Sequence, residues 1–394
     1  MNLDHLPLLD HHAHPLYREA GWRAAPLEAY FTEAYDSAQL ALHSRSGIFF
    51  LRSVRELAAF YGCAPSPEAL QEARAAADYA KVTDRLLRAA GIGEVLLDDG
   101  FLQGVLMTVR ESAKLPWKVR RILRLEGELA ALVPFHDDAK SLLGAFERHL
   151  REVAPTLAGF KSIIAYRTGL DVRRREPGEV ERAYTDLKRG LAEGEVPKLS
   201  SKPLLDAALW TALGVARDAG LPVQFHTGYG DPDLDLRLAS PLHLRAIFED
   251  EDLRGLNVVM LHCYPFTREA GYLASVYPGA HLDLGLTIPF ASLNAMRTHV
   301  REALHLAPLS KILFSTDASR TPELFYLGAR WGRRVIGEVL SDTAADGDLT
   351  GEQAEWAAER LLRGNAQDLY GSGLPGTGSV RTELQALHSL GGNL

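Results

Sequence analysis

The stretches LPLLDHHAH (residues 6–14), PVQFH (222–226), VVMLH (258–262) and KILFSTD (311–317) each run from apolar residues into a histidine or an aspartate. Short apolar runs bounded by turn residues are typical of buried parallel strands. Working outward from them, we predict eight strands, at Leu6–Asp10, Glu94–Asp98, Arg121–Leu125, Ala158–Ile164, Val223–His226, Asn257–His262, Ala280–Leu284 and Lys311–Ser315.

Helical patterns lie between many of these runs, at Asp138–Glu152, Leu204–Ala219, Pro241–Asp250, Thr267–Tyr277 and Leu293–Leu306. Alternation of strand and helix indicates a parallel sheet, and eight such units close into a barrel. The sequence therefore predicts an α/β fold, a (β/α)8 TIM barrel with a helical insertion after the first strand.

The insertion is the segment 16–93, which is too long for a simple crossover and is rich in Ala, Leu, Glu and Arg. That composition favours helices. Because the segment follows a strand, it leaves the barrel at the mouth where active sites form, so we predict a helical cap, with a dimer face as a compatible role. A second insertion, 165–222, follows the fourth strand. The predicted domains are a barrel (1–15 and 94–370), the cap (16–93) and a C-terminal tail (371–394).

Composition narrows the class of partner and the compartment. The 394 residues include 43 Lys and Arg and 51 Asp and Glu, a net charge of −8, which argues against nucleic acid as the main partner. The only cysteines, Cys63 and Cys263, exclude a disulfide scaffold and fit a reducing compartment. No apolar stretch is long enough to span a membrane, and no signal-peptide pattern is present. We expect a cytoplasmic protein that acts on a small molecule.

Histidines at the strand ends point to metal chemistry. Residues two apart on a strand face the same side, so His12 and His14 are both expected to point inward, with His11 facing the outer helices. Neutral imidazole binds zinc-like ions well, although a lone pair of this kind is weak evidence. His226, His262 and Asp317 end other predicted strands, and a barrel gathers such ends at one mouth. Each could be a packing residue alone, but five together favour a site.

With Asp10-x-His12-x-His14, His226, His262 and Asp317 in this order, the chain resembles the amidohydrolase superfamily, and most closely its amidohydrolase-2 branch. GNAQDLY (364–370) is similar to the helix that ends many members. The segments 159–170, 222–236, 261–278 and 282–290 look closest to the amidohydrolase domain fused to glutamine synthetase-like domains. No such second half follows here, so the resemblance implies no ligase activity.

The resemblance implies one divalent metal, zinc or else manganese, held by His12, His14, His226 and Asp317. His262 would be a catalytic group beside it, and Asp317 could also accept the proton of the bound water. A divalent ion lowers the pKa of bound water from about 16 to about 7, which makes hydroxide available at neutral pH.

Lys161, in the predicted fourth strand, is open to three interpretations. It could be a cation that binds substrate or assists catalysis, a carboxylated lysine that bridges a second metal, or a structural residue. Arg167 and Arg320 follow the fourth and eighth strands and could either bind a carboxylate or brace a loop.

These features support three hypotheses on function. The first is a metal-dependent hydrolase of a small polar amide, ester or cyclic amide that uses a metal-activated water. The second is a metal-dependent decarboxylase or other lyase of the same superfamily. The third is a barrel that has lost catalysis and serves as a binding module, which the intact ligand set argues against.

Overall fold

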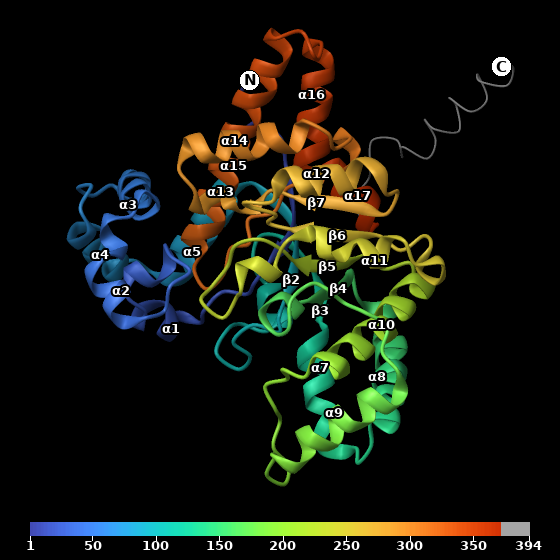
Figure 1. Cartoon of the computed structure of the whole chain (residues 1–394). Coiled ribbons are helices and arrows are strands. Elements are labelled where there is room, and N and C mark those ends of the chain that lie inside the picture. Colours follow the sequence, from blue (N-terminus) through green and yellow to red (C-terminus); the bar gives the residue numbers. More distant parts are fainter. Residues whose placement is uncertain (372–394) are drawn as a thin grey trace, which may run out of the picture.

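The computed structural model describes residues 1–371, so the predicted tail 371–394 lies almost entirely outside the described residues. Eight parallel strands form the sheet in the order β1-β2-β3-β4-β5-β6-β7-β9, with helices around them (Figure 1). The predicted TIM barrel is therefore confirmed. The strands are β1 Leu8–Ala13, β2 Ile92–Asp98, β3 Lys118–Arg124, β4 Gly159–Ser162, β5 Val223–His226, β6 Val258–Leu261, β7 Ala280–Asp283 and β9 Ile312–Leu313, with the short β8 Gly285–Leu286 after β7.

The seam between the first and last strands is closed by the chain that follows them. Asp317 N donates to His12 O at 3.1 Å and His14 N donates to Ala318 O at 2.8 Å. Arg320 N then donates to Pro15 O at 3.0 Å. These bonds continue the parallel pairing beyond β1 and β9, so the two segments that carry the predicted ligands are joined backbone to backbone.

A short helix closes the other end of the barrel. Inside the barrel, Leu9, Leu96 and Leu313 pack with Tyr370 of α17 (Asn365–Tyr370). Asn365 Nδ2 donates to Ile312 O at 2.7 Å, and Arg120 Nη2 donates to Tyr370 O at 2.8 Å. The segment 364–370 thus fills the N-terminal end of the barrel, and the C-terminal end is left for the site.

The remaining helices surround the sheet. They are α6 Val109–Ser112, α7 Leu125–Leu132, α8 Ala139–Val153, α9 Pro177–Arg189, α10 Lys202–Ala219, α11 Arg245–Phe248, α12 Thr267–Val276, α13 Thr287–Phe290, α14 Leu293–Leu304, α15 Pro322–Ala345 and α16 Gly351–Glu359. In the second insertion, α9 packs against α8 and α10. Among residues 1–371 we find no helix that combines the length and apolar character needed to cross a bilayer.

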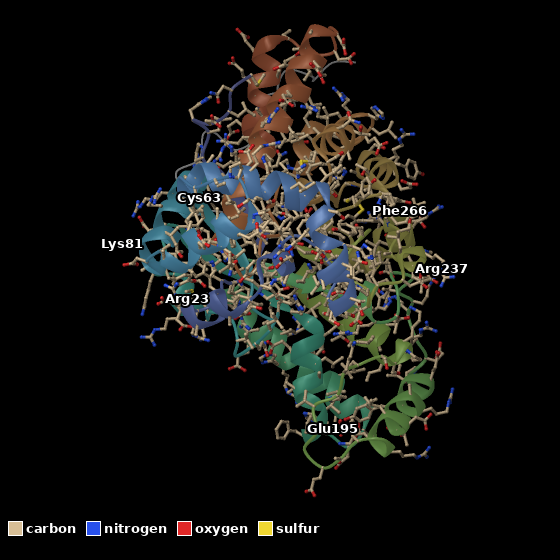
Figure 2. All side chains as sticks on the ribbon, turned by 90° about the vertical axis from the view of Figure 1, so that its left-hand side faces the viewer. Arg23, Cys63, Lys81, Glu195, Arg237 and Phe266 are labelled. Carbon is tan, nitrogen blue, oxygen red and sulfur yellow. The ribbon has the colours of Figure 1, made fainter. Side chains whose placement is uncertain are left out.

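The segment after β1 is helical, as its composition predicts. It contains α1 (Glu19–Ala24), α2 (Ser37–Leu42), α3 (Ile48–Tyr61), α4 (Pro67–Ala76) and α5 (Tyr79–Ala90). The last of these packs against α15, as a crossover helix of the barrel does. Helices α1–α4 gather on one side of the barrel in Figure 1, and Figure 2, viewed from that side, shows them in front of it.

A buried carboxylate attaches this helical segment to the barrel. Glu323, at the start of α15, accepts hydrogen bonds from Arg74 Nε at 2.7 Å, Tyr61 OH at 2.8 Å and Trp22 Nε1 at 3.2 Å. The Arg74 guanidinium also stacks 4.5 Å from the ring centre of Trp22. Since Glu323 and Arg74 are both buried, each charge depends on the other for compensation.

We predict that Arg74→Met destabilises the fold by about 3–5 kcal/mol, because it leaves the carboxylate of Glu323 buried and unpaired. The control is Arg45→Met, which removes an exposed arginine paired with Glu28 and Glu68 and should cost less than about 1 kcal/mol. Urea unfolding measures both free energies. Equal effects of the two variants would contradict the anchoring role.

Candidate active site and metal centre

The C-terminal end of the barrel opens into a pocket of about 260 Å³. Five of the residues predicted from the sequence line it, in β4 and β5 or shortly after β1, β6 and β9: His14, Lys161, His226, His262 and Asp317. His12 is completely buried directly beneath, with its Nε2 atom 3.0 Å from Lys161 Nζ. All the predicted site residues therefore meet at one place.

Backbone strain is concentrated at this pocket. His262, Leu286, Asp317 and Arg320 have φ values of 69°, 57°, 48° and 67°, in the left-handed region that residues with a Cβ atom disfavour. All four line the pocket. Strained backbone that is held by its surroundings is characteristic of functional sites.

His12, His14 and Asp317 form a group suited to a metal ion, with ligand atoms that all lie within 4.8 Å of one another. Asp317 Oδ1 is 3.1 Å from His12 Nε2 and 3.4 Å from His14 Nε2. His226 lies outside this group, although its ring centre is 4.7 Å from that of His262, which in turn is 5.8 Å from that of His12. Three of the four predicted ligands are thus close enough together to bind one ion. The fourth, His226, lies beside His262.

The protonation of these groups suits a divalent cation. Burial, together with Lys161, lowers the pKa of His12 to about 3, and burial lowers that of His262 to about 4. Burial alone would raise the pKa of Asp317, but the neighbouring His262, His12 and His14 outweigh it and lower the pKa well below its usual range. Asp317 Oδ1 and His226 Nε2 are buried and have no hydrogen-bond partner in residues 1–371. Neutral imidazoles beside an ionised carboxylate are the donor set that a metal requires.

His11 corrects one expectation. It was predicted to face the outer helices, but it is fully buried in the barrel, where Nε2 is 3.0 Å from Asp283 Oδ1 and the ring stacks on Tyr370. The pairing of β1 with β2 shifts register between Asp10 and Ala13. Such an irregularity breaks the strict alternation of sides, so His11 and His12 can both serve the interior.

Asp283, at the end of β7, supports the site from below. It accepts hydrogen bonds from the His262 backbone N at 3.2 Å and from Ser315 Oγ at 3.1 Å, and its Oδ2 atom is 3.7 Å from His262 Nδ1. At 3.7 Å Asp283 makes no hydrogen bond to Nδ1, but its negative charge favours the tautomer of His262 with the proton on that atom, which leaves Nε2 free toward the pocket. Our sequence analysis missed Asp283, and extending the search for strand-end polar residues to the seventh strand would have found it.

Asp98 and Arg124 form a second pair that the sequence analysis missed. Arg124 Nε and Nη2 donate to Asp98 Oδ2 at 2.9 and 2.6 Å, at the ends of β3 and β2. The backbone O of Asp98 lies 3.0 Å from His14 Nδ1, so this pair fixes the orientation of the His14 ring. Asp98 ends the second predicted strand, so a search for polar residues at strand ends would have found this pair as well.

Glu33, from the segment between α1 and α2, is the residue that the helical insertion contributes to the pocket lining. Burial, assisted by the charge of Asp317, raises its pKa to about 7. Tyr35, two residues on, donates to Asp233 Oδ1 at 2.9 Å, in the loop after β5 that also lines the pocket. Nothing in the sequence singled out Glu33, because its approach to the site depends on how the insertion folds back.

The fold is a TIM barrel, and the strand ends bring together side chains that could hold a metal ion. The profile of the amidohydrolase family Amidohydro_2 matches residues 176–372, and the chain belongs to this family. The resemblance inferred from the sequence is thereby confirmed.

Three individual proteins are similar to this chain. A protein of Lactobacillus casei ATCC 334 described as a metal-dependent hydrolase has a TM-score of 0.82 at 30% identity, over 94% of this chain and 96% of that chain. Protein fluG of Emericella nidulans is 32% identical over 405 residues, which cover 92% of this chain and 45% of fluG. The chain thus spans less than half the length of that relative. Uronate isomerase of Thermotoga maritima, at 13% identity and a TM-score of 0.62 over 93% of this chain and 95% of that chain, shares the fold.

We predict that Lys161 titrates far below an ordinary lysine, because burial lowers its pKa to about 8. In metal-free protein the neutral amine should then rise from about a tenth at pH 7 to about nine tenths at pH 9. NMR of ¹³C-labelled lysine follows this change, and Lys161→Arg identifies the signal by removing it. Titration of that signal above pH 10 would contradict the assignment and the readiness of Lys161 for carboxylation.

Proposed function

We propose that this chain is a metal-dependent hydrolase of a small polar amide, ester or cyclic amide that uses a metal-activated water. The observation that carries the proposal is the group of His12, His14 and Asp317, whose ligand atoms converge at the floor of the pocket. Family membership and the similarity to the Lactobacillus casei protein support it.

In this proposal His12, His14 and Asp317 hold the metal, with His226 as the fourth ligand. A bound divalent ion would supply hydroxide at neutral pH and polarise the substrate carbonyl. The proposed metal is zinc, with manganese as the alternative, at one ion per chain. A second ion would require carboxylation of Lys161, whose Nζ atom already lies 3.0 Å from His12 Nε2.

The proton steps fall to Asp317 and His262. Asp317 Oδ2 is 3.7 Å from His262 Nε2, so a proton that the carboxylate takes from the attacking water can pass to the imidazole and on to the leaving group. His262 is neutral before the reaction, because burial lowers its pKa to about 4. Asp283, near Nδ1, stabilises the imidazolium that forms.

The proposal also covers the compartment, the partner and the role of the helical insertion. We place the enzyme in the cytoplasm, acting on a small molecule, with the helices of 16–93 as a cap that contributes Glu33 to the pocket. The same segment exposes Leu42 and Ile48, which would suit a homodimer face.

We predict about one equivalent of zinc or manganese per chain in protein purified without chelator. Elemental analysis measures the content, and hydrolysis of a panel of amides, esters and cyclic amides should follow metal occupancy. Less than about 0.2 equivalents without activation by added metal would contradict a metal-dependent enzyme. Release of carbon dioxide from carboxylic acids without uptake of water would instead support the lyase.

We predict that His12→Ala lowers metal occupancy, whereas His262→Ala retains the metal and loses about 100- to 10,000-fold of turnover, as expected for a proton-transfer group. His299→Ala is a matched control, since His299 is a buried histidine bonded to Thr267 outside the pocket lining. Metal content and kcat are measured on each variant. Equal loss of metal from the His12 and His262 variants would place His262 among the ligands.

A further inference from the structure

We infer that the substrate of this pocket carries a carboxylate and that Arg320 binds it. This inference rests on the proposed function, because it names the class of polar substrate that the site takes. It begins with the four cationic side chains that line the pocket, which are Arg124, Lys161, Arg167 and Arg320.

Three of these cations are already compensated or engaged. Arg124 has a two-pronged contact with Asp98, and Lys161 Nζ lies against His12 Nε2. Arg167 is within electrostatic reach of two acidic residues, Asp231 and Asp233 of the loop after β5, whereas Arg320 is within such reach of Glu33, whose pKa is raised to about 7. The carboxylates of Asp231 and Asp233 offset the charge of Arg167.

The backbone of Arg320 is held rigidly over the site. Its N atom donates to Pro15 O at 3.0 Å, and its O atom accepts from Tyr17 N at 2.8 Å, so the residue belongs to the closed seam of the barrel. It adopts a φ of 67° there, a conformation that an arginine disfavours. It follows Asp317 by three residues, which places the side chain in the same pocket as the proposed metal ligands.

The guanidinium of Arg320 is oriented but makes no ion pair in the part of the chain that the structure describes. Nε donates to Ser319 Oγ at 3.3 Å, and Cζ lies 5.8 Å from the ring centre of Tyr30. Within residues 1–371, no carboxylate oxygen comes within 4.0 Å of it, and its two Nη groups make no hydrogen bond. A planar fork of free N–H donors in a pocket is the geometry that binds a carboxylate through two parallel hydrogen bonds.

The charge of the site favours the same ligand. A bound divalent ion together with Arg320 would carry more positive charge than Asp317 and Glu33 carry negative charge, since the pKa of Glu33 is raised to about 7. An anionic group is therefore attracted to this part of the pocket. The substrate class is a small carboxylic acid whose amide, ester or lactam carbonyl reaches the His12, His14 and Asp317 group while its carboxylate lies on Arg320.

Binding of two probes of equal length tests the inference without turnover. Glutarate carries carboxylates, and glutaramide carries neutral amides in their place. Titration of each into the full chain, metal-free and zinc-loaded, is followed by NMR. In the metal-free protein, where an anion cannot bind zinc, Arg320→Met should lower the affinity for glutarate by about tenfold or more and leave glutaramide unchanged.

Further variants separate the causes. Arg320→Lys keeps the charge without the fork and should retain part of the affinity. Arg330→Met, which removes an exposed arginine of α15 paired with Glu56, should bind glutarate as the wild type does. Circular dichroism confirms that each variant is folded.

Three results would overturn the inference: equal glutarate binding by the wild type and Arg320→Met, no glutarate binding by the metal-free wild type, or loss of binding in Arg167→Met in place of Arg320→Met. Zinc content and hydrolysis are read separately. Dependence on Arg320 in a protein that binds no metal would reject the hydrolase and keep the carboxylate site. Hydrolysis by a protein whose glutarate binding does not depend on Arg320 would keep the hydrolase and reject the carboxylate site.

Discussion

The backbone hydrogen bonds that join the end of β1 to the segment after β9 are the constraint on which the site depends. Asp317 N bonds to His12 O, and His14 N bonds to Ala318 O, so Asp317 is set at a fixed spacing from His12 and His14, which lie about 300 residues before it in the sequence. Left-handed φ values at Asp317 and Arg320 are the cost of this closure. The same bonds that complete the barrel thereby assemble its candidate metal centre.

Burial then determines the chemistry that these side chains can perform. It holds His12 and His262 neutral, whereas the surrounding histidines keep Asp317 ionised against it. The backbone O of Asp98 and the carboxylate of Asp283 lie beside the rings of His14 and His262 and orient them. Orientation by such neighbours is what gives a metal site or a proton-transfer histidine its defined geometry.

The helical segment after β1 acts on the same pocket from outside the barrel. Its attachment through Arg74 and Glu323 occurs at the start of α15, six residues after Asp317. A second contact, from Tyr35 to Asp233, reaches the loop after β5. Held at both places, the segment brings Glu33 to the pocket wall, and a rigid wall restricts water and orients a substrate.

The sequence by itself determined the barrel, because apolar runs that each end in a single polar residue identify both the strands and the end of the barrel where the site lies. It also located His12, His14, His226, His262 and Asp317, since the ends of parallel strands must meet. Only the tertiary structure decided which side chains of β1 point into the barrel, because the register shift after Asp10 turned His11 inward. It alone showed that Glu33 reaches the pocket and that Arg320 makes no ion pair there with any described residue. Those properties depend on contacts between segments distant in sequence, and local patterns of hydrophobicity carry no record of such contacts.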